Sequence, residues 1–599
     1  MIPPILLSLA DLLGKDARIN VTAEWECDEA GRWHLPVTVA LSVAPANHIP
    51  SETRWRLVIG PNQPADGVYY YPDADSGLDT TFRHQDANPD PASGSRWRLG
   101  KPCLERPIGG LGRDQCGDEP QEIDAAALWK AGRLMQWIDA AATDSLAAPG
   151  SPNELPAGLG QGSSVAIGFN EGVDDIDWAS STVARWGFAS LAAVPAAKST
   201  WALIELFDQR SASVRRFQWG KVLREATANV NSVWVLVPAL PVFEPWRRPS
   251  TWAELTSVLA QQGIDLPQVM ATAGTRYRSG KRPTASHRLL IGFPYASRVG
   301  GQPERLHWIA IGKMSLAGRT EMRDGFRPRE ESRQLWDRQL AQSNGALNWL
   351  RTENWSPDQL RSRGGAEPLV RNSKILVIGA GSLGSAVAEN LCRAGALQLG
   401  VMDGETLAVG NLVRHALAMI DIGLNKATAL VRNLNFVAPG ADLEPIPYNF
   451  EAQTATSIPA VADAIRDYDV VIDCTGSDDA LDELAAFDWQ NEKTFITLSM
   501  TWEAEGLLAF CARETRFPAI DAKHRFAAAG APAVRHEDAP IEAIGCWNPV
   551  FPADADDVQL WAAHGSKFVR SAILDPRRRL AYFRRTNDGG TEVIDVGPS

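Results

Sequence analysis

Residues 374–396 read KILVIGAGSLGSAVAENLCRAGA, and their pattern indicates the fold of the C-terminal part of the chain. The continuous apolar run at 375–378 predicts a strand, and Gly379, Gly381 and Gly384 follow it before a predicted helix. Glycines at this spacing permit a tight turn and a close backbone approach, while the helix N-terminus offers N–H groups and a positive dipole end to phosphate. We therefore predict a nucleotide-binding strand–loop–helix unit.

A second predicted strand, LQLGVMD, follows that helix and ends at Asp403. In dinucleotide-binding units, a carboxylate about 20 residues after the glycine loop hydrogen-bonds ribose hydroxyls. The loop and the carboxylate alone would suit a nicotinamide-dependent oxidoreductase equally well. They would also suit a fold of this kind that binds no nucleotide.

The residues after Asp403 separate these alternatives. Asn411 and Arg414 stand in the segment GETLAVGNLVRHA that follows it, and Lys426 stands further on in GLNKATAL. Hydride transfer has no special need for such a set. Attack of a carboxylate on an α-phosphate does, because negative charge builds on the phosphorus oxygens and on the departing pyrophosphate. Arginine suits multidentate phosphate contact and lysine acts as a point charge, so the ordered set predicts adenylation of a carboxylate.

With these motifs the C-terminal part resembles the ThiF/MoeB/HesA superfamily, the adenylation core shared with ubiquitin-activating enzymes. The resemblance is strong over residues 373–500 and looser over 500–599. It implies ATP and Mg²⁺, a homodimer, and the C-terminal carboxylate of a small ubiquitin-like protein or peptide as substrate. It also implies that the glycine loop and Asp403 hold ATP, with three residues at the phosphates: Asn411, Arg414 and Lys426.

The stretch YDVVIDCTGSDDAL, residues 468–481, matches the metal-site stretch of this superfamily. Asp473 is the magnesium ligand that the resemblance implies. Many members carry a second aspartate three residues later, where this chain has Gly476, so Asp478 or Asp479 remain alternative ligands. Mg²⁺ takes hard oxygen ligands and often only one or two protein carboxylates. The zinc cysteines of the superfamily are absent.

The seven cysteines are odd in number and contain no CxxC pair: 27, 103, 116, 392, 474, 511 and 546. This disfavours both a disulfide framework and a four-cysteine zinc site. Cys546 lies between Gly545 and Trp547 in a turn-like context. Activating enzymes carry a thiol downstream of the metal-site strand, which takes the carboxylate from AMP as a thioester, and the resemblance implies this role for Cys546. The alternative is a packed small hydrophobe.

The N-terminal part has three strand-like segments, at 17–26, 34–43 and 53–60, a long irregular stretch at 67–103, and then a helical run at 122–143. Strands followed by a helix indicate an α+β domain. An apolar N-terminal stretch without a basic region or cleavage site predicts a short helix docked on this domain rather than a signal peptide.

This domain resembles a ubiquitin-conjugating fold over residues 15–143. The run Gly100–Leu104 corresponds to the stretch that holds the conjugating cysteine, which makes Cys103 the second candidate thiol. His84 aligns with the histidine that opens the family's His-Pro-Asn element, but Gln85 and Asp86 replace the rest, so the oxyanion asparagine is missing. Cys116 is the next candidate thiol here, and an unrelated α+β domain with a buried cysteine is the alternative. Four cysteines are expected to be packing residues: Cys27, Cys392, Cys474 and Cys511.

Two linker-like stretches, 144–165 and 355–372, divide the 599 residues into three domains. We predict a ubiquitin-conjugating-like α+β domain at 1–150, a mixed α/β linker domain at 166–350, and a Rossmann-like adenylation domain at 356–599. The run at 330–350 predicts a helix. No chemical constellation is readable in the linker domain.

Composition excludes some classes of partner. A net charge of −13 argues against nucleic acid or an anionic membrane as the main partner. No apolar run reaches the roughly 20 residues that span a bilayer. The cysteine pattern and the absence of a signal peptide favour the reducing cytoplasm.

A conjugating-type domain, a linker domain and an activating domain in one chain resemble the fused activating–conjugating enzymes of bacterial antiphage operons. The nearest pattern is the CBASS type, which attaches the C-terminus of a cGAS-like nucleotidyltransferase to a target amine. A bacterial ubiquitin-like protein conjugation enzyme is the nearest alternative. A sulfur-carrier adenylyltransferase of cofactor biosynthesis is another, although it leaves residues 1–350 unexplained.

Overall fold

The computed structural model describes residues 2–62, 67–104, 120, 122–159, 164–181, 185–195, 197, 199–279, 287–318, 327, 329–450, 458–531 and 550–596. They form two compact units. The first comprises Met1–Ala193, Ala197–Phe217 and Ala228–Asn354, and the second comprises Val194–Ala196, Gln218–Thr227 and Trp355–Ser599. In the part of the chain that is described, no helix is long and apolar enough to cross a membrane.

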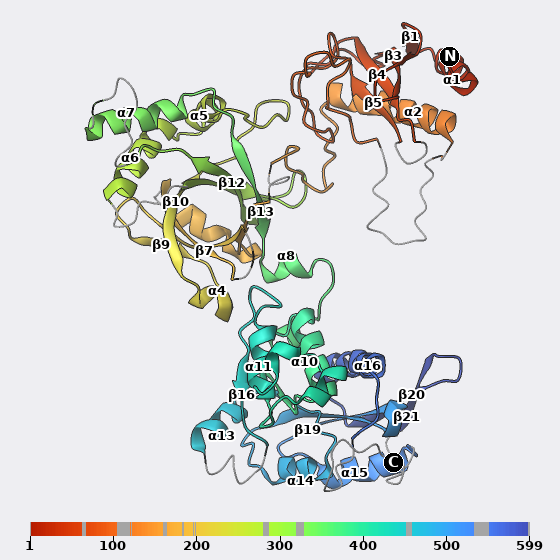
Figure 1. The fold of residues 1–599 in the computed structure, drawn as a ribbon, viewed down its shortest axis with the longest axis vertical. Helices are drawn as coiled ribbons and strands as arrows, with labels where there is room; N and C mark the ends of the chain where they lie inside the picture. Colours follow the sequence, from red (N-terminus) through yellow and green to blue (C-terminus); the bar gives the residue numbers. More distant parts are fainter. Residues whose placement is uncertain are drawn as a thin grey trace. The chain divides into compact units, whose positions relative to one another are not determined.

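The N-terminal part of the first unit is an antiparallel sheet flanked by two helices (Figure 1). Its elements are α1 (Pro4–Leu13), β1 (Ile19–Val21), β2 (Glu26–Cys27), β3 (Trp33–Ala40), β4 (Glu52–Ile59), β5 (Val68–Pro72) and α2 (Ile123–Ala142). Leu6, Leu9 and Leu13 are buried on one face of α1, so the predicted N-terminal helix does dock on this domain. The strands predicted at 34–43 and 53–60 and the late helix are confirmed, whereas the segment 17–26 contains only the short β1 and the first residue of β2. The stretch expected to be irregular contains β5, because five alternating residues there pair with β4.

The rest of the first unit is a second sheet, of order β6-β13-β12-β11-β10-β7-β8-β9, and β6 also pairs with β8. The strands are β6 (Ala166–Phe169), β7 (Trp186–Ala193), β8 (Thr200–Phe207), β9 (Ser213–Arg216), β10 (Ala228–Leu236), β11 (His287–Tyr295), β12 (Arg305–Met314) and β13 (Asn348–Asn354). The helical elements are η1 (Val173–Ile176), α3 (Asp177–Ser181), α5 (Trp252–Gln261), α6 (Leu266–Ser279) and α7 (Glu330–Ala341). Because β6 pairs on both sides, the sheet closes on itself.

The helix expected across 330–350 is wrong in its second half. The helix ends at Ala341, and residues 348–354 form β13. The run Ser343-Asn344-Gly345 separates the two elements, and β13 gains backbone hydrogen bonds from strands on both of its sides. Tertiary pairing therefore decides the conformation there.

The second unit is built on an eight-stranded sheet of order β16-β15-β14-β17-β18-β19-β20-β21 (Figure 1). The strands are β14 (Ile375–Ile378), β15 (Leu399–Met402), β16 (Glu444–Ile446), β17 (Val470–Asp473), β18 (Lys493–Met500), β19 (Gly506–Glu514), β20 (Arg579–Arg585) and β21 (Thr591–Val596). The helices are α4 (Lys221–Glu225), α8 (Pro357–Arg361), α9 (Pro368–Asn372), α10 (Ser382–Ala394), α11 (Lys426–Leu434), α13 (Pro459–Arg466), α14 (Asp478–Ala486), α15 (Ala519–Ala528) and α16 (Ala555–Leu574), with short 3₁₀ turns η2 (Val409–Val413), η3 (Met419–Asp421) and η4 (Trp502–Ala504).

Helices cover both faces of this sheet. Ile375 and Val377 of β14 point into a core shared with α10, α11 and α16, whereas Leu376 and Ile378 point into a core shared with α13, α14 and α15. A strand buried on both faces reads as a continuous apolar run, which explains the sequence ILVI. Strands β14 to β18 pair in parallel, so their carboxyl ends lie at one edge of the sheet. In open α/β sheets that edge is where ligands bind.

Candidate active site

The glycine loop joins β14 to α10 at the carboxyl edge of the second unit's sheet. Gly379 has φ +85°, a left-handed conformation that favours glycine. A Cβ at Gly384 would lie 1.9 Å from the Gly379 carbonyl oxygen, so the helix can approach the loop this closely only without a side chain there. A Cβ at Gly381, the residue before α10, would meet no atom within 4 Å. The loop therefore leaves open space beside the helix N-terminus, as a phosphate requires.

Asp403 follows β15 and reaches the glycine loop from the neighbouring strand. Its buried carboxylate accepts hydrogen bonds from the backbone N–H of Ala380 at 2.7 Å and of Glu405 at 2.8 Å. Burial raises the pKa of Asp403, and these two N–H groups act in the opposite direction. The Asp403 carboxylate is thus held against the glycine loop that is predicted to bind ATP.

Arg414 lies just after η2 and contacts the start of α10. Its Nε donates to the Ser382 hydroxyl at 3.1 Å, and its Nη1 donates to the Phe551 carbonyl at 2.5 Å. The Asn411 side chain accepts from the Ala408 N–H at 3.0 Å and so closes the turn that leads to Arg414. Arg414 therefore stands beside the open end of the glycine loop, and Asn411 shapes the backbone before it.

Lys426 is the first residue of α11 and its side chain is buried. Its ammonium lies 2.5 Å from the Glu405 carboxylate, and its backbone N–H donates to the Glu405 carbonyl. Asn425 caps α11 and donates a side-chain hydrogen bond to the Asp403 carbonyl at 2.8 Å. These contacts bring Lys426 and Asp403 together although the whole stretch 404–425 separates them in the sequence.

Several residues of this cluster were not singled out from the sequence. His415 lies 2.6 Å through Nε2 from the Ala380 carbonyl, and its Nδ1 accepts from the Leu417 N–H at 3.1 Å. These partners assign the proton to Nε2, and burial lowers the pKa of His415, so the ring is neutral. Its position after Arg414 was the only available signal, and a single histidine carries no motif. Ser382, Glu405 and Asn425 were missed for the same reason.

Asp473 ends β17, directly opposite Ile378 at the end of β14. Its buried carboxylate accepts from the Thr475 hydroxyl at 2.7 Å and from the Thr497 hydroxyl. Burial raises the pKa of Asp473. Asp478 and Asp479 are exposed in the first turn of α14. Across the described residues, no group of three or more acidic, histidine or cysteine side chains could hold a metal ion.

Of the two candidate thiols, only Cys103 lies within the described residues. Cys546 and the alternative thiol Cys116 lie outside the described residues. Cys103 is exposed, and its backbone N–H donates to the His84 carbonyl at 2.8 Å.

Three of the other cysteines fit the expected packing role and one does not. Burial raises the pKa of Cys392 to about 11 and of Cys511 to about 12, and it raises the pKa of the half-buried Cys474 as well. Cys27 was expected to pack but is exposed. It belongs to a two-residue strand that, among the described strands, pairs with β3 alone, at the edge of the sheet.

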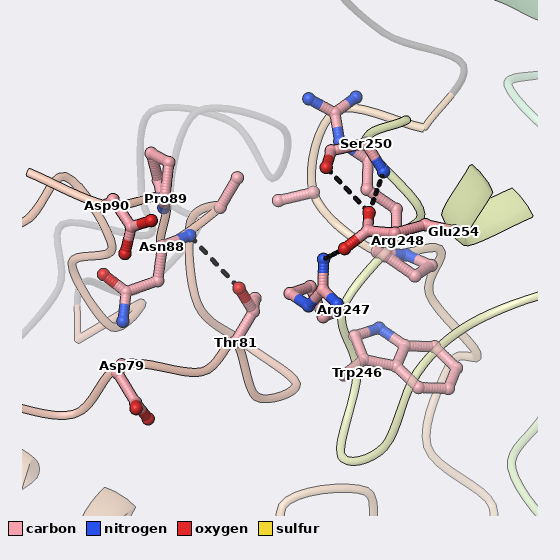
Figure 2. Close-up of a pocket in the computed structure, with 13 residues that line it drawn as sticks. Asp79, Thr81, Asn88, Pro89, Asp90, Trp246, Arg247, Arg248, Ser250 and Glu254 are labelled. Atoms are coloured by element: carbon pink, nitrogen blue, oxygen red, sulfur yellow. Dashed lines mark hydrogen bonds and ion pairs between the residues drawn. The ribbon is translucent and has the colours of Figure 1, made fainter. Parts of the chain in front are cut away.

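A cavity of about 490 Å³ lies in the first unit, between loop 79–90 and residues 246–254 (Figure 2). Glu254 accepts hydrogen bonds from Arg247 at 2.9 Å and from the backbone N–H and hydroxyl of Ser250, so this carboxylate of the wall is paired with Arg247. None of the residues predicted for adenylation lines this cavity. We therefore place the candidate active site at the glycine loop, on its polar contacts.

Comparisons with known proteins match several parts of the chain. The model of the ThiF family matches residues 363–515, and the model described as the Cap2 central linker domain matches residues 144–355. The adenylyltransferase and sulfurtransferase UBA4 of Lodderomyces elongisporus is 34% identical over 111 residues, which are 18% of this chain and 23% of that protein. A crystal structure of Escherichia coli MccB with AMPCPP and MccA covers 45% of this chain and 71% of its own, at 12% identity and a TM-score of 0.28.

A relative that matches almost the whole chain identifies the family. The ATP-dependent ubiquitin transferase-like protein Cap2 of Enterobacter hormaechei is 42% identical over 591 residues, which cover 99% of this chain and 98% of that protein. The predicted fold class, an α/β and α+β multidomain chain with a Rossmann-like adenylation domain of the ThiF type, is confirmed. The chain belongs to the Cap2 family of ATP-dependent ubiquitin transferase-like proteins.

Proposed function

We propose that this chain activates a protein C-terminal carboxylate with ATP and passes it through two thioesters to a target amine. One observation carries the first step: Asp403 and Arg414 contact the glycine loop at Ala380 and Ser382, and Lys426 begins the helix whose cap, Asn425, donates to the Asp403 carbonyl. In that step the carboxylate oxygen bonds to the α-phosphorus and pyrophosphate leaves. The name of the Enterobacter hormaechei relative supports ATP as the co-substrate.

The cations would act where charge develops. Arg414, beside the first residue of α10, would contact phosphate at the helix N-terminus, where the helix dipole adds to its charge. Lys426 is neutralised by the exposed carboxylate of Glu405, which a phosphate oxygen would replace as the partner of the ammonium. Both groups are held before the reaction begins, so they stabilise the developing charge without reorganisation. Asn411 would serve the same phosphate-binding turn.

Magnesium is the cofactor that such a site would use, and Asp473 is its proposed protein ligand. The carboxylate sits at the carboxyl end of β17, next to the strand that carries the glycine loop. Oδ1 accepts both the N–H and the hydroxyl of Thr475, and Oδ2 accepts only the Thr497 hydroxyl, which leaves a lone pair on Oδ2. Mg²⁺ commonly keeps several waters and takes only one or two carboxylates. The residues therefore fit the ion, which supplies neutralising charge at the phosphates when bound.

Asp473→Asn is expected to abolish Mg²⁺-dependent ATP–pyrophosphate exchange, because the amide is a much poorer ligand for a hard cation. Exchange measured across a magnesium titration checks this. Asp478→Asn, on the exposed start of α14, is the matched control and should leave the titration unchanged. If Asp478→Asn is the damaging change and Asp473→Asn is tolerated, the metal ligand lies downstream of Gly476.

Each of the three predicted domains would have its own role in the thioester steps. In domain 356–599, the Cys546 sulfur would attack the adenylate carbonyl and release AMP. In domain 1–150, Cys103 would then take the acyl group, before an amine of the target attacks its thioester. Domain 166–350 would link them, and tethering makes the exchange between two thiols intramolecular. Cys103 is exposed, as an acceptor of a protein-sized group must be.

The carboxylate donor is proposed from the family. Antiphage defence, with the C-terminus of a cGAS-like nucleotidyltransferase as the donor, is the first candidate, and a ubiquitin-like protein is the second. The genes next to the one that encodes this chain should identify the donor. Purified chain, ATP and each candidate donor, separated on a non-reducing gel, test the proposal: a reductant-sensitive band is expected. Adenylate without any such band would favour a sulfur-carrier adenylyltransferase, and NAD binding without pyrophosphate exchange would favour an oxidoreductase.

A homodimer through the second unit is also proposed. Exposed apolar side chains gather between residues 409 and 424, including Val413, Met419 and Ile420, which are 69%, 77% and 85% exposed. Apolar groups left in water at this density mark protein interaction surfaces. The stretch contains Arg414 and precedes Lys426, so a partner copy seated here would lie beside the candidate active site.

Ile420→Asp is expected to weaken the dimer by about 10³ in Kd. Disrupting an interface anchor costs about 2 kcal/mol, and a two-fold interface contains the change twice. Sedimentation velocity over a concentration series measures the effect. Ile520→Asp, which alters an equally apolar and 75% exposed side chain on α15, is the control and should not dissociate the dimer. A wild-type chain that stays monomeric at high micromolar concentration would contradict the dimer.

A further inference from the structure

His84 and Cys103 face each other across a short antiparallel bridge in the N-terminal part of the first unit. Gln85 pairs with Pro102, and the Cys103 N–H donates to the His84 carbonyl at 2.8 Å. Opposed residues of an antiparallel pair have Cα atoms about 5 Å apart. Both residues are exposed. His84 and Cys103 are therefore neighbours at an accessible part of the domain.

Glu154 holds His84 in an unusual conformation. His84 has φ +53°, in the left-handed region that few residues other than glycine adopt. One oxygen of the Glu154 carboxylate accepts the His84 backbone N–H at 2.7 Å, and the other lies 3.2 Å from Nδ1 of the ring. A single carboxylate thus fixes both the backbone and the ring of His84. Backbone strain that is held by specific contacts is common at functional sites.

The surroundings of His84 favour its charged form. The hydrogen bond to Glu154 is the main cause that raises the pKa of His84, and burial acts in the opposite direction. A carboxylate that accepts a hydrogen bond from an imidazole favours the charged form of the ring. The charge of Arg83 opposes this shift, and Arg83 itself lies near Asp144 and Glu244.

The loop that carries His84 is internally braced. Gln85 accepts from the Phe82 N–H at 2.8 Å and donates to the Gly100 carbonyl at 2.8 Å, which ties the loop to the strand segment before Cys103. Figure 2 shows the Asn88 N–H bonded to the Thr81 hydroxyl, closing the loop beside the cavity. His84 is therefore presented to Cys103 by a preformed structure.

Glu154 itself is anchored outside the conjugating-like domain. The Asn153 N–H donates to the Ser297 carbonyl, and the Asn153 carbonyl accepts from the Tyr295 hydroxyl at 2.9 Å. The Asn153 side chain also accepts from Arg83 at 3.2 Å, next to His84. The carboxylate thus reaches His84 from a segment that is bonded to the end of β11 and the residues after it.

We propose that Glu154 is a positioning residue that holds His84 as an imidazolium beside Cys103 and so favours the Cys103 thiolate. This rests on the proposed role of Cys103 in the relay. The thiolate sulfur bonds to the thioester carbonyl carbon, the bond to the donor sulfur breaks, and the donor leaves as a thiolate, so no proton moves. A fixed cation beside the attacking sulfur stabilises the form that reacts. The linker region would thereby control the reactivity of the conjugating thiol.

The rate of Cys103 alkylation by iodoacetamide, followed over pH in the full-length chain by mass spectrometry of the Cys103 peptide, tests the proposal. Glu154→Gln and His84→Gln should each move the midpoint of the profile upward by about 1 pH unit, the effect of one nearby charge. Because Glu154 acts through His84, the double variant should move it no further than His84→Gln alone. Glu29→Gln, which alters an exposed carboxylate of the same domain, is the control.

A rescue separates charge from folding. Adding His84→Lys to Glu154→Gln restores a permanent cation and should return the midpoint to that of the wild type. An unchanged midpoint in Glu154→Gln, a downward shift, or failure of the lysine to rescue would overturn the proposal. Alkylation does not depend on thioester formation. If Cys103 never carries a thioester while the midpoint still shifts, the relay is wrong and the His84–Glu154 pairing stands.

Discussion

Replacing Arg414 by alanine is expected to slow ATP–pyrophosphate exchange by about 10²–10³ while ATP binding changes little. Loss of one preorganised donor to a developing charge typically has this size. Arg414 reaches the first residue of α10 through Ser382, so its charge lies at the helix N-terminus where phosphate would bind. ATP itself retains the glycine loop and Asp403, which Arg414→Ala leaves in place.

Lys426→Ala is expected to slow ATP–pyrophosphate exchange by a similar factor, although the two side chains differ in their surroundings. The ammonium is buried and paired with Glu405, so its removal leaves that carboxylate beside the phosphates. Exchange should therefore fall at least as far as in Arg414→Ala. Arg393→Ala, which removes an exposed arginine of α10, is the matched control and should exchange at the wild-type rate. Exchange within a factor of two of wild type in both site variants would refute the adenylation assignment.

The adenylation fold was readable because its signals are local. The strand, the glycine loop and the helix of the stretch 374–396 each follow from short-range rules, and the carboxylates of Asp403 and Asp473 end strands that the apolar pattern marks. The contacts that organise the site are not local. Arg414 meets Ser382 across 32 residues and Phe551 across 137, and His415 meets Ala380 across 35. The periodicity of apolar residues in the sequence does not predict such long-range contacts.

The fold of the linker domain could not be predicted from the sequence for a related reason. Its strand β6 pairs in parallel with β13 and with β8, so the sheet closes through residues such as Ile167 and Thr352, which come from near the two ends of the domain. Closure depends on tertiary pairing, which also turned residues 348–354 into a strand at the end of an apparently helical run. Glu154 shows the consequence for function. It lies in a segment that reads as a linker, yet its carboxylate holds the histidine opposite Cys103.

Cys546→Ala, supplied with ATP and the true carboxylate donor, is expected to form the adenylate and to lose the thioesters at both cysteines. Cys546 follows the metal-site strand in the domain whose Arg414 and Lys426 would make the adenylate, so it should receive the carboxylate first. Exchange between two thiols is nearly balanced in free energy. Direction must therefore come from adenylate formation upstream and from transfer to an amine downstream.

Cys103→Ala should keep the Cys546 thioester and lose only the final conjugate. The double variant should lose no more product than either single variant, because residues that act in one sequence are not additive. Cys27→Ala changes another exposed cysteine of the same domain, and it should conjugate as the wild type does. Non-reducing gels with and without thiol, together with a direct assay of the adenylate, separate these states. A Cys103 thioester that forms at a normal rate in Cys546→Ala would reverse the order. Full conjugation by Cys103→Ala would remove the conjugating role from the N-terminal domain.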